Sequence, residues 1–330
     1  MKKEKNTVSV VIPSRNEEDY IEKCIRSVLA SDYGTQNLEI VVADGMSTDQ
    51  TRTIVKRLQS ESPNILLVDN PRQTTPYGLN AGIKASQGEF VMILGAHSEI
   101  STDYIRENLR ILLDHKDIGG AGGRIVNGYS DEVSEAISIA MSSKFGVGNA
   151  KFRTTDYEGY VDTAAFAVYR REVFDRVGFF DENLVRNQDA EFNYRLRQAG
   201  YRIYLTNACY AIYYVRSSFK KLFRQYFQYG YWKIHFNYIY KRITSVRQVF
   251  PLFYLLNVLV MLFSWLFWMP LFYLTLGFTF LHFVLALYFA MNSSSTFKQK
   301  AKILGGFYIL HISYGLGYLK GIFQVPFMKK

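Results

Sequence analysis

The sequence predicts an α/β fold with a mostly parallel sheet. Four short apolar stretches, rich in β-branched residues, alternate with stretches of helical pattern in the N-terminal third of the chain. Each of these stretches is almost wholly apolar, whereas a strand with one solvent-exposed face alternates polar and apolar residues. Together, the two observations indicate a sheet that is covered by helices on both faces.

The predicted elements follow in order along the chain. Each strand is an apolar run that ends at a proline, an Asp-Gly or another polar turn signal. The strands are expected at residues 8–12, 38–43, 64–68 and 89–94. The helices are expected at residues 18–30, 49–60, 76–86, 170–178 and 187–201. Two polar segments rich in glycine, 119–128 and 145–161, are expected to be loops around a site.

Candidate site residues follow the predicted strands directly, where parallel sheets bind their ligands. Asp44-Gly45 comes after the second strand, and Gly95-Ala96-His97 comes after the fourth. An isolated Asp-Gly is usually only a turn. An isolated histidine in a loop more often makes an ordinary hydrogen bond than it binds a metal ion. Their position at one edge of a sheet makes them candidates for a binding site.

The charge changes sign along the chain. All 29 acidic residues and 22 of the 39 lysines and arginines lie in residues 1–191, which carry a formal charge of −7, whereas residues 192–330 carry +17. A switch this sharp indicates parts in different surroundings. We predict an α/β domain at 1–215, basic aromatic helices at 216–247 and a membrane domain at 248–330.

The C-terminal part has the composition of a membrane-bound segment. Residues 216–247 hold eight basic residues, ten aromatic residues and no acid, which fits a helix in a membrane interface. Nucleic acid is the rival partner for such a stretch. The next 50 residues, 248–297, lack any Asp, Glu, Lys or Arg and are long enough for two crossings with a turn near Pro270. This run favours the membrane and argues against nucleic acid.

The orientation follows from the flanking cations. Basic residues lie before the uncharged run and again after it, at Lys298, Lys300 and Lys302, so both flanks are expected in the cytoplasm. A third uncharged stretch, 303–319, is short and rich in glycine, and whether it crosses is left open. We therefore expect a multi-pass protein of the cell membrane whose N-terminal domain lies on the cytoplasmic face.

The cysteines and the N-terminus agree with a cytoplasmic domain. Cys24 and Cys209 are the only cysteines, and we expect two reduced thiols instead of a disulfide. Only five apolar residues precede Pro13, which is too few for the core of a signal peptide.

In combination, the motifs of residues 1–245 closely resemble the family 2 glycosyltransferases. The segments that carry this resemblance are VSVVIPSRNEEDYI (8–21), EIVVADGMSTDQT (39–51), GLNAGIKASQGEFVMILGAH (78–97) and YRREVFDRVGFFDENLVRNQDAEFNYRLRQAGY (169–201). Three further segments, 143–154, 160–174 and 224–233, resemble the branch that contains succinoglycan-type exopolysaccharide glucosyltransferases. The resemblance implies a GT-A fold and an inverting transfer from a nucleotide sugar, in which a UDP-sugar is the favoured donor.

The resemblance also implies roles for individual residues. Asp189 matches the family's general base, and Gln188 stands where the family has a glutamate. A carboxylate is needed there because the attacking hydroxyl must lose its proton. The residues that match the donor-binding segments are Pro13, Arg15, Glu17, Asp44, Gly95 and Ala96. The residues expected to orient acceptor or donor are Asp162, Gln188, Arg224, Gln225 and Tyr226.

The motif Gly95-Ala96-His97 stands where the family places the two aspartates of D-x-D, which hold a metal. The branch often has histidine in the last place, so His97 is expected to be a metal ligand. A neutral imidazole suits Mn²⁺ better than Mg²⁺. Gly95 departs from the pattern, because it removes a carboxylate, and a water is one candidate replacement. Metal-assisted transfer is the main expectation, with metal-independent transfer and an inactive fold as alternatives.

The acceptor is expected to be a lipid-linked saccharide in cell-surface polysaccharide synthesis, because a domain held at the bilayer would meet such a lipid at its headgroup. Lys220, Lys221 and Arg224 could attract its diphosphate or ordinary anionic lipid. Two rivals stay open, a processive polysaccharide synthase and a non-catalytic membrane scaffold. A dinucleotide-dependent dehydrogenase is disfavoured, because no G-x-G-x-x-G follows the first strand.

Overall fold

The protein is described by a computed structural model that covers residues 6–148, 150–154, 156–241, 243, 248–293 and 296–324. The chain divides into two compact units. The first unit comprises Met1–Val126 and Lys151–Tyr214, and the second comprises Asn127–Ala150 and Val215–Lys330. The segment 127–150 thus belongs to the same unit as the C-terminal helices, although it lies within the sequence of the α/β part.

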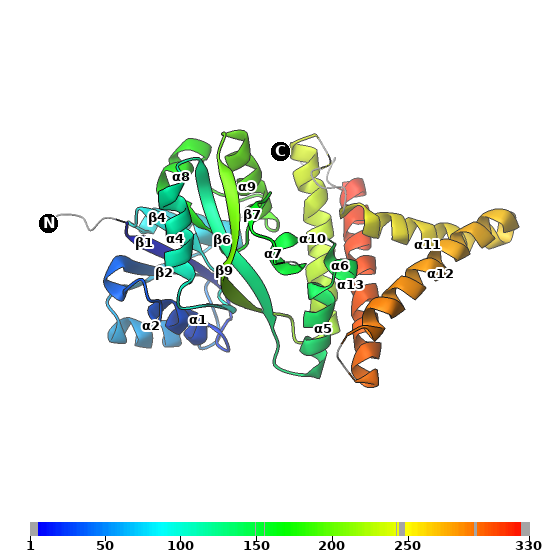
Figure 1. Cartoon of the computed structure of the whole chain (residues 1–330), viewed down its shortest axis with the longest axis horizontal. Helices are drawn as coiled ribbons and strands as arrows, with labels where there is room; N and C mark the ends of the chain where they lie inside the picture. Colours follow the sequence, from blue (N-terminus) through cyan, green and yellow to red (C-terminus); the bar gives the residue numbers. More distant parts are fainter. Residues whose placement is uncertain are drawn as a thin grey trace. The chain divides into compact units, whose positions relative to one another are not determined.

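The first unit is built on a nine-stranded mixed sheet whose order is β3-β2-β1-β4-β8-β6-β9-β5, with β7 paired to β9. The strands are β1 (Val8–Ser14), β2 (Leu38–Asp44), β3 (Ile65–Asp69), β4 (Phe90–Ile93), β5 (Ser98–Ile100), β6 (Ile118–Gly128), β7 (Gly159–Tyr160), β8 (Val168–Arg170) and β9 (Arg202–Tyr214). Its helices are α1 (Ile21–Leu29), the short 3₁₀ turn η1 (Thr35–Asn37), α2 (Thr51–Glu61), α3 (Thr75–Ala85), α4 (Tyr104–Asp114), α7 (Lys151–Thr154), α8 (Arg171–Val177) and α9 (Gln188–Gln198). Helices α1, α2, α3, α4, α8 and α9 each pack against strands of this sheet (Figure 1).

The predicted α/β fold is confirmed, and the four predicted strands and five predicted helices are present with ends shifted by a few residues. Strands β1, β2, β3 and β4 are parallel neighbours. Strands β1, β2 and β4 are largely buried, which explains their nearly continuous apolar runs, whereas β3, at the edge of the sheet, is partly exposed. Beyond β4 the sheet continues with antiparallel pairs, β4 with β8 and β8 with β6. This antiparallel half, including β5 and β9, was not predicted.

The expectation of a loop at 119–128 is wrong, because these residues form most of β6. Their glycines reflect close packing. A methyl group on Gly123 would lie 2.6 Å from Cε2 of Tyr104 and 2.8 Å from the Cys209 carbonyl oxygen. The expectation of a loop at 145–161 is also partly wrong, since α6 (Lys144–Val147), α7 and β7 occupy parts of this segment, while residues 149 and 155 lie outside the described part of the chain.

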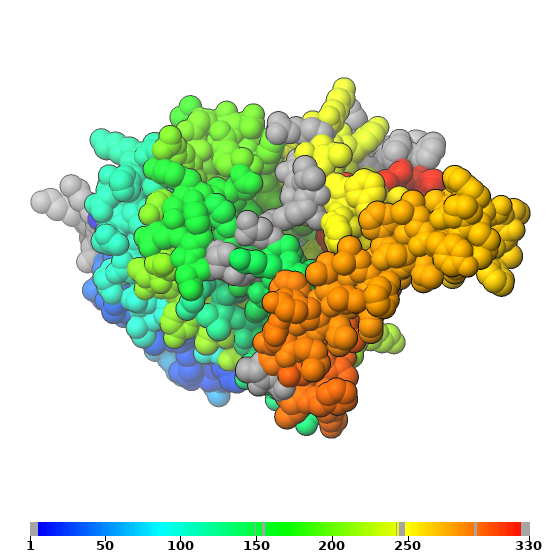
Figure 2. Space-filling view, turned by 45° about the vertical axis from the view of Figure 1, so that its right-hand side comes forward, coloured from blue at the N-terminus to red at the C-terminus, as the bar shows by residue number. Residues whose placement is uncertain are grey.

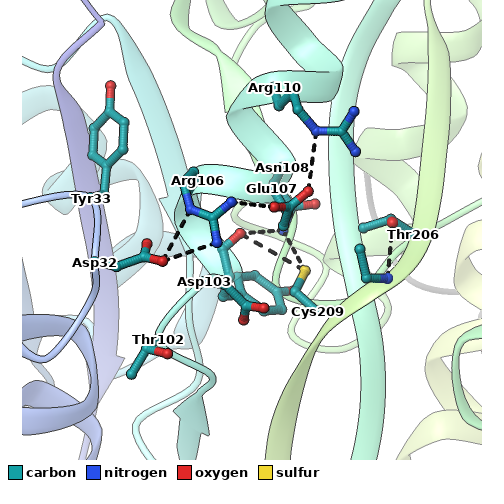
Figure 3. Close-up of polar contacts among 12 residues, drawn as sticks. Asp32, Tyr33, Thr102, Asp103, Arg106, Glu107, Asn108, Arg110, Thr206 and Cys209 are labelled. Carbon is teal, nitrogen blue, oxygen red and sulfur yellow. Dashed lines mark hydrogen bonds and ion pairs between the residues drawn. The ribbon is translucent and has the colours of Figure 1, made fainter.

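The expectation of two reduced thiols is confirmed, because Cys24 and Cys209 are both free and buried. Figure 3 shows Cys209 beside α4, where the Asn108 amide donates to its sulfur at 3.4 Å. Burial raises the pKa of the Cys209 thiol to about 12. On the outer face of α4, Arg106 pairs with Asp32 at 3.0 Å and ties this helix to the segment after α1. Cys209 is therefore a packing residue and has no reactive thiolate.

The second unit is helical. Its helices are α5 (Glu132–Ser142), α6 (Lys144–Val147), α10 (Phe219–Ile239), α11 (Phe250–Phe267), α12 (Met269–Met291) and α13 (Phe297–Gln324). Helices α10 and α13 lie side by side along much of their length (Figure 1). The close approach depends on glycine. A methyl group on Gly230 would collide with the Tyr314 carbonyl oxygen, and one on Gly317 would collide with that of Phe227.

Helices α11 and α12 form an apolar hairpin with a turn at Trp268, close to the turn predicted at Pro270. Both helices are long and apolar enough to cross a membrane. Figure 2 shows the part of the hairpin around this turn, coloured gold to orange, projecting away from the other helices of this unit. Between the two helices, the Asn257 amide donates to the Thr279 hydroxyl at 2.9 Å and to the Thr275 carbonyl. The Asn257 amide is thus satisfied within the hairpin, as polar groups of helices in lipid must be.

The exposed surface of the hairpin is the surface of a membrane-associated chain. Phe267 is 84% exposed, and Trp265, Phe263 and Leu262 are each exposed by more than half. An exposed apolar patch of this size on a water-facing helix would promote aggregation. The stretch 303–319, left open above, lies inside α13, which is not one of the two candidate spans found among the described residues.

Candidate active site

The polar edge of the first unit lies where β1, β2 and β4 end. The register places Pro13 beside Ala43 and Ser14 beside Asp44. Ile93, at the end of β4, lies two residues before Gly95. Because these three strands are parallel, their carboxyl ends bring the segments after them to one edge of the sheet. The residues predicted from three separate motifs therefore belong to one region.

Asp44, with Ser47 and Arg52, forms one part of this edge, which we call the Asp44 corner. Its carboxylate is fully buried and accepts hydrogen bonds from the Ser47 backbone N–H at 3.0 Å and from Arg52 Nη1 at 2.8 Å. Arg52 also pairs with Asp69, at the end of β3, at 2.8 Å. The two carboxylates, first Asp44 and then Asp69, raise the pKa of the Arg52 guanidinium. This network fixes the turn after β2 and compensates the Asp44 charge inside the protein.

His97 forms the second corner and is held in a defined orientation. Its Nδ1 lies 3.3 Å from Oε1 of Glu17, and its carbonyl oxygen accepts from the Tyr214 N–H at 3.1 Å. An ionised carboxylate can only accept, so the Nδ1 of a neutral imidazole carries the proton and its Nε2 keeps a lone pair. A carboxylate behind a histidine in this way is the arrangement that orients metal-binding imidazoles.

Aromatic rings surround His97 on several sides. The ring of Tyr213 is 5.0 Å from it and the ring of Tyr20 is 6.4 Å away, centroid to centroid. Tyr214 stacks beside Tyr20 and donates its hydroxyl to Glu99 at 2.6 Å. Our sequence analysis missed these residues. Tyr213 and Tyr214 lie on β9, and the sequence contained no signal that β9 would pair with β5 immediately after His97.

Gly95, which replaces an aspartate in the predicted motif, is covered by an aromatic ring. A methyl group on Gly95 would lie 3.3 Å from Cε1 of Phe166 and 3.4 Å from the Ser98 hydroxyl oxygen. A larger side chain here would require Phe166 to move. Phe166 has a φ of +52°, a strained value for an aromatic residue. Ala96 is buried between Gly95 and His97.

The part of the chain that the structure describes contains no cluster of three or more His, Cys, Asp or Glu side chains that could hold a metal ion by itself. His97 with Glu17 is a partial set, in which the imidazole Nε2 is the one oriented ligand. A divalent cation fits this set only if a bound ligand completes its coordination, as the oxygens of a nucleoside diphosphate do for cations that bind few protein groups.

Asp189 lies in the first turn of α9, with an exposed side chain. Burial first, and the charge of Asp189 second, raise the pKa of the Tyr169 phenol above its ordinary value. Tyr169 also donates to Asn193 at 2.9 Å and is the register partner of Val91 in β4. The start of α9 is thereby tied to β8, the strand next to β4. Gln188 is the first residue of the same helix.

The remaining predicted residues have other settings. Arg15 is exposed after β1 and packs against Gly45. Asp162 is 86% exposed and pairs with Arg197 at 3.2 Å, and the described residues show no contact between it and His97. Arg224, Gln225 and Tyr226 lie on α10 in the second unit, where Gln225 donates to the Tyr229 hydroxyl at 3.0 Å.

Relatives among known proteins share most of the chain. A dolichyl N-acetyl-α-D-glucosaminyl phosphate 3-β-D-2,3-diacetamido-2,3-dideoxy-β-D-glucuronosyltransferase from Methanococcus voltae is 32% identical over 77% of this chain and 82% of its own length. The succinoglycan biosynthesis protein ExoA from Rhizobium meliloti is 33% identical over 74% of both chains.

Solved structures share the fold. The mannosyltransferase PcManGT from Pyrobaculum calidifontis, determined in complex with GDP-Man and Mn²⁺, superimposes with a TM-score of 0.62 over 97% of this chain and 88% of its own, at 17% identity. The TarS protein of S. aureus in complex with UDP-GlcNAc superimposes with a TM-score of 0.51 over 93% of this chain and 91% of its own, at 16% identity.

The family match agrees with these comparisons. The family described as Glycosyl transferase family 2 matches residues 9–178, which hold β1 to β4, the Asp44 corner and the His97 corner. The resemblance seen in the sequence motifs is therefore confirmed, and the chain is a glycosyltransferase that belongs to glycosyl transferase family 2.

Proposed function

We propose that this protein is an inverting glycosyltransferase that moves a sugar from a nucleotide-sugar donor to a lipid-linked saccharide in cell-surface polysaccharide synthesis. The observation that carries the proposal is the common sheet edge. That edge holds the Asp44 corner and the oriented His97, and Asp189 lies in the same unit, at the start of α9. The rest of the chain supplies attachment to the membrane.

In this proposal Asp189 is the general base. The acceptor hydroxyl transfers its proton to the Asp189 carboxylate while its oxygen forms a bond to the anomeric carbon of the donor sugar. The bond from that carbon to the diphosphate oxygen breaks, and its electron pair leaves with the nucleoside diphosphate. The displacement occurs on the face opposite the leaving group, so the configuration inverts.

We assign the nucleoside side of the donor to the segment after β1 and the turn after β2, which hold Pro13, Arg15, Glu17 and Asp44. Asp44 is compensated by Arg52 and Ser47, so we expect it to shape this pocket as much as to contact the base. Gly95 and Ala96 give backbone close to the donor. A divalent cation, when bound, would neutralise charge on the diphosphate. His97 would hold it, and Mn²⁺ is favoured over Mg²⁺ on ligand softness.

The relatives support a lipid-linked acceptor. The relative from Methanococcus voltae is named for transfer to a dolichyl-linked sugar phosphate. A relative from Campylobacter jejuni, 34% identical over 28% of this chain, is named for transfer to an undecaprenol-linked saccharide. In this chain the hairpin α11–α12 enters the membrane with both flanks on the cytoplasmic side, and the basic, aromatic α10 lies at the interface. Arg224, Gln225 and Tyr226 on α10 are then candidates for the acceptor side.

The test uses the full-length protein in detergent. It is incubated with UDP-, GDP- and dTDP-sugars and a lipid-linked acceptor fraction, with and without Mn²⁺, and release of nucleoside diphosphate is measured together with the anomeric configuration of the product. We expect release with one donor class, dependence on Mn²⁺ and an inverted product. A retained configuration, or no release with any donor, would contradict the proposal.

A further inference from the structure

Arg153 on α7 lies in the region of His97, and neither the sequence motifs nor the family match gives it a role. Its guanidinium carbon is 4.8 Å from the centre of the Tyr213 ring, and that ring is 5.0 Å from the His97 imidazole. We propose that Arg153 binds the diphosphate of the nucleotide donor and supplies positive charge to the leaving group. This inference rests on the proposed function and adds a residue to its donor site.

The setting of α7 directs Arg153 toward Tyr213. Phe152 packs against the buried core cluster of the first unit, and the ammonium of Lys151 lies 3.5 Å above the Tyr157 ring. After α7, the Asp156 carboxylate accepts from Arg124 at 2.7 Å. These contacts hold the residues on both sides of the short helix α7. The position of Arg153 between them is therefore set by packing.

Acidic residues lie near His97, so an anionic ligand at this edge would be stabilised by a further cation. Glu17 lies 3.3 Å from the imidazole, and Glu99 follows His97 by two residues on β5. Gly95 stands in place of a carboxylate that would otherwise help to hold a metal, and the described residues offer no three-ligand cluster. A nucleoside diphosphate brings more negative charge to this edge. A fixed guanidinium stabilises the charge that develops on the departing diphosphate without any reorganisation.

Stacking on Tyr213 is compatible with holding phosphate. The cation–π contact engages the flat face of a guanidinium, whereas phosphate oxygens are bound through its in-plane N–H groups. Arginine makes bidentate contacts of this kind and keeps its charge at all physiological pH values. The rival explanation is that Arg153 only packs against Tyr213 and thereby supports the position of His97.

The experiment separates these two roles by the number of phosphates on the ligand. Dissociation constants of the full-length protein in detergent are measured by calorimetry, with competition for weak ligands, for nucleosides and for their mono- and diphosphates in the uridine, guanosine and thymidine series. The variants are Arg153→Gln and Arg153→Lys. The matched control is Arg202→Gln, because Arg202 lies 4.6 Å over the Tyr160 ring in the same unit without contacting the His97 cluster.

We expect Arg153→Gln to weaken binding of the diphosphate by about tenfold to hundredfold, since a charge-assisted hydrogen bond is lost. The dissociation constant of the nucleoside should change by less than about twofold, because the nucleoside has no phosphate that Arg153 could bind. Arg153→Lys should fall between, since it keeps the charge and loses the planar fork. The diphosphate affinity of the wild type should fall with added salt more steeply than that of Arg153→Gln.

Three results would count against the inference, and they differ in what they imply. Equal loss of nucleoside and diphosphate binding, or no loss at all, in Arg153→Gln while the wild type binds the diphosphate would assign Arg153 a packing role and leave the proposed function intact. If the wild type binds none of the diphosphates, both the inference and the proposed function are wrong. A similar selective loss in Arg202→Gln would show a general charge effect and also count against the specific role of Arg153.

Discussion

The two units place the same residue types in opposite settings. In the first unit the large apolar side chains, such as Phe192 and Phe90, are buried against the sheet, and the charged groups gather at its edge. In the hairpin of the second unit, Phe263, Phe267 and Trp268 face outward, and the polar side chain of Asn257 points between the two helices. The difference indicates two solvents, water for the first unit and lipid for the hairpin.

The comparison also separates two kinds of close packing. Glycines in the first unit let a strand or a ring approach, as Gly123 does beside Tyr104 and Gly95 beside Phe166. Glycines in the second unit let whole helices meet, as Gly230 and Gly317 do between α10 and α13. Substitutions in the first unit should therefore affect chemistry first, and substitutions in the second should affect stability first. Four predictions test this division, in order of decreasing size.

The largest effect is expected at Asp189. Replacing Asp189 by Asn removes the proposed base and should lower the turnover number by about a hundredfold to ten-thousandfold. The side chain is exposed, so thermal unfolding should be unchanged. Turnover is measured as release of nucleoside diphosphate. Asp117→Asn, an exposed carboxylate paired with Arg202, is the control and should keep most of its activity. Equal activity of the two variants would remove Asp189 from the mechanism.

The second effect concerns the carboxylate behind His97. Glu17→Ala leaves the imidazole without its 3.3 Å partner, so the orientation of its Nε2 is lost. We expect the Mn²⁺ concentration for half-maximal activity to rise by about tenfold to hundredfold, as for other residues that orient metal ligands. Glu18→Ala, one residue away, is a suitable control because Glu18 accepts instead from the backbone N–H of Gln50. An unchanged Mn²⁺ requirement in Glu17→Ala would show that His97 does not hold the metal.

The third effect tests the packing of the second unit. Gly317→Ala places a methyl group against the Phe227 carbonyl oxygen and should cost about 1–3 kcal/mol of stability. Unfolding in detergent can be followed by tryptophan fluorescence, because all three tryptophans of the chain lie in the second unit. Gly305→Ala, on the same helix with nothing within 4 Å of the added methyl group, should be neutral or stabilising. A neutral Gly317→Ala would mean that α10 and α13 can separate at little cost.

The smallest effect is expected at the cap of α5. The Asp131 carboxylate accepts from the backbone N–H groups of Val133 and Ser134, each at 2.8 Å. Removing it in Asp131→Ala should cost about 1 kcal/mol. The hydrogen bond from Ser134 lowers the pKa of Asp131, so its stabilisation is present above the pKa of the unfolded chain and is lost as the pH falls through the folded value. Denaturation at pH 7 and in acid measures this, and Asp131→Asn should keep most of the cap at both.

Much of the first unit could be read from the sequence. The runs at 8–12, 38–43 and 89–94 are largely buried and the run at 64–68 is buried in part, and the apolar character of all four marks them as strands without any knowledge of their partners. The same holds for the hairpin, because 50 residues without a charge leave few settings other than a membrane. The motifs around Asp44, His97 and Asp189 belong to these strands and helices, so their family could be identified as well.

By itself, then, the sequence determined the fold class, the parallel half of the sheet, the reduced state of both cysteines, the apolar hairpin and the glycosyltransferase family. The tertiary structure alone decided that 118–128 and 202–214 are strands, that Glu17 lies behind His97, that Phe166 covers Gly95 and that Arg153 stacks beside Tyr213. The physical reason is the range of the interactions. Burial and helical periodicity leave a local pattern, whereas pairing between antiparallel strands and contacts between distant side chains leave none.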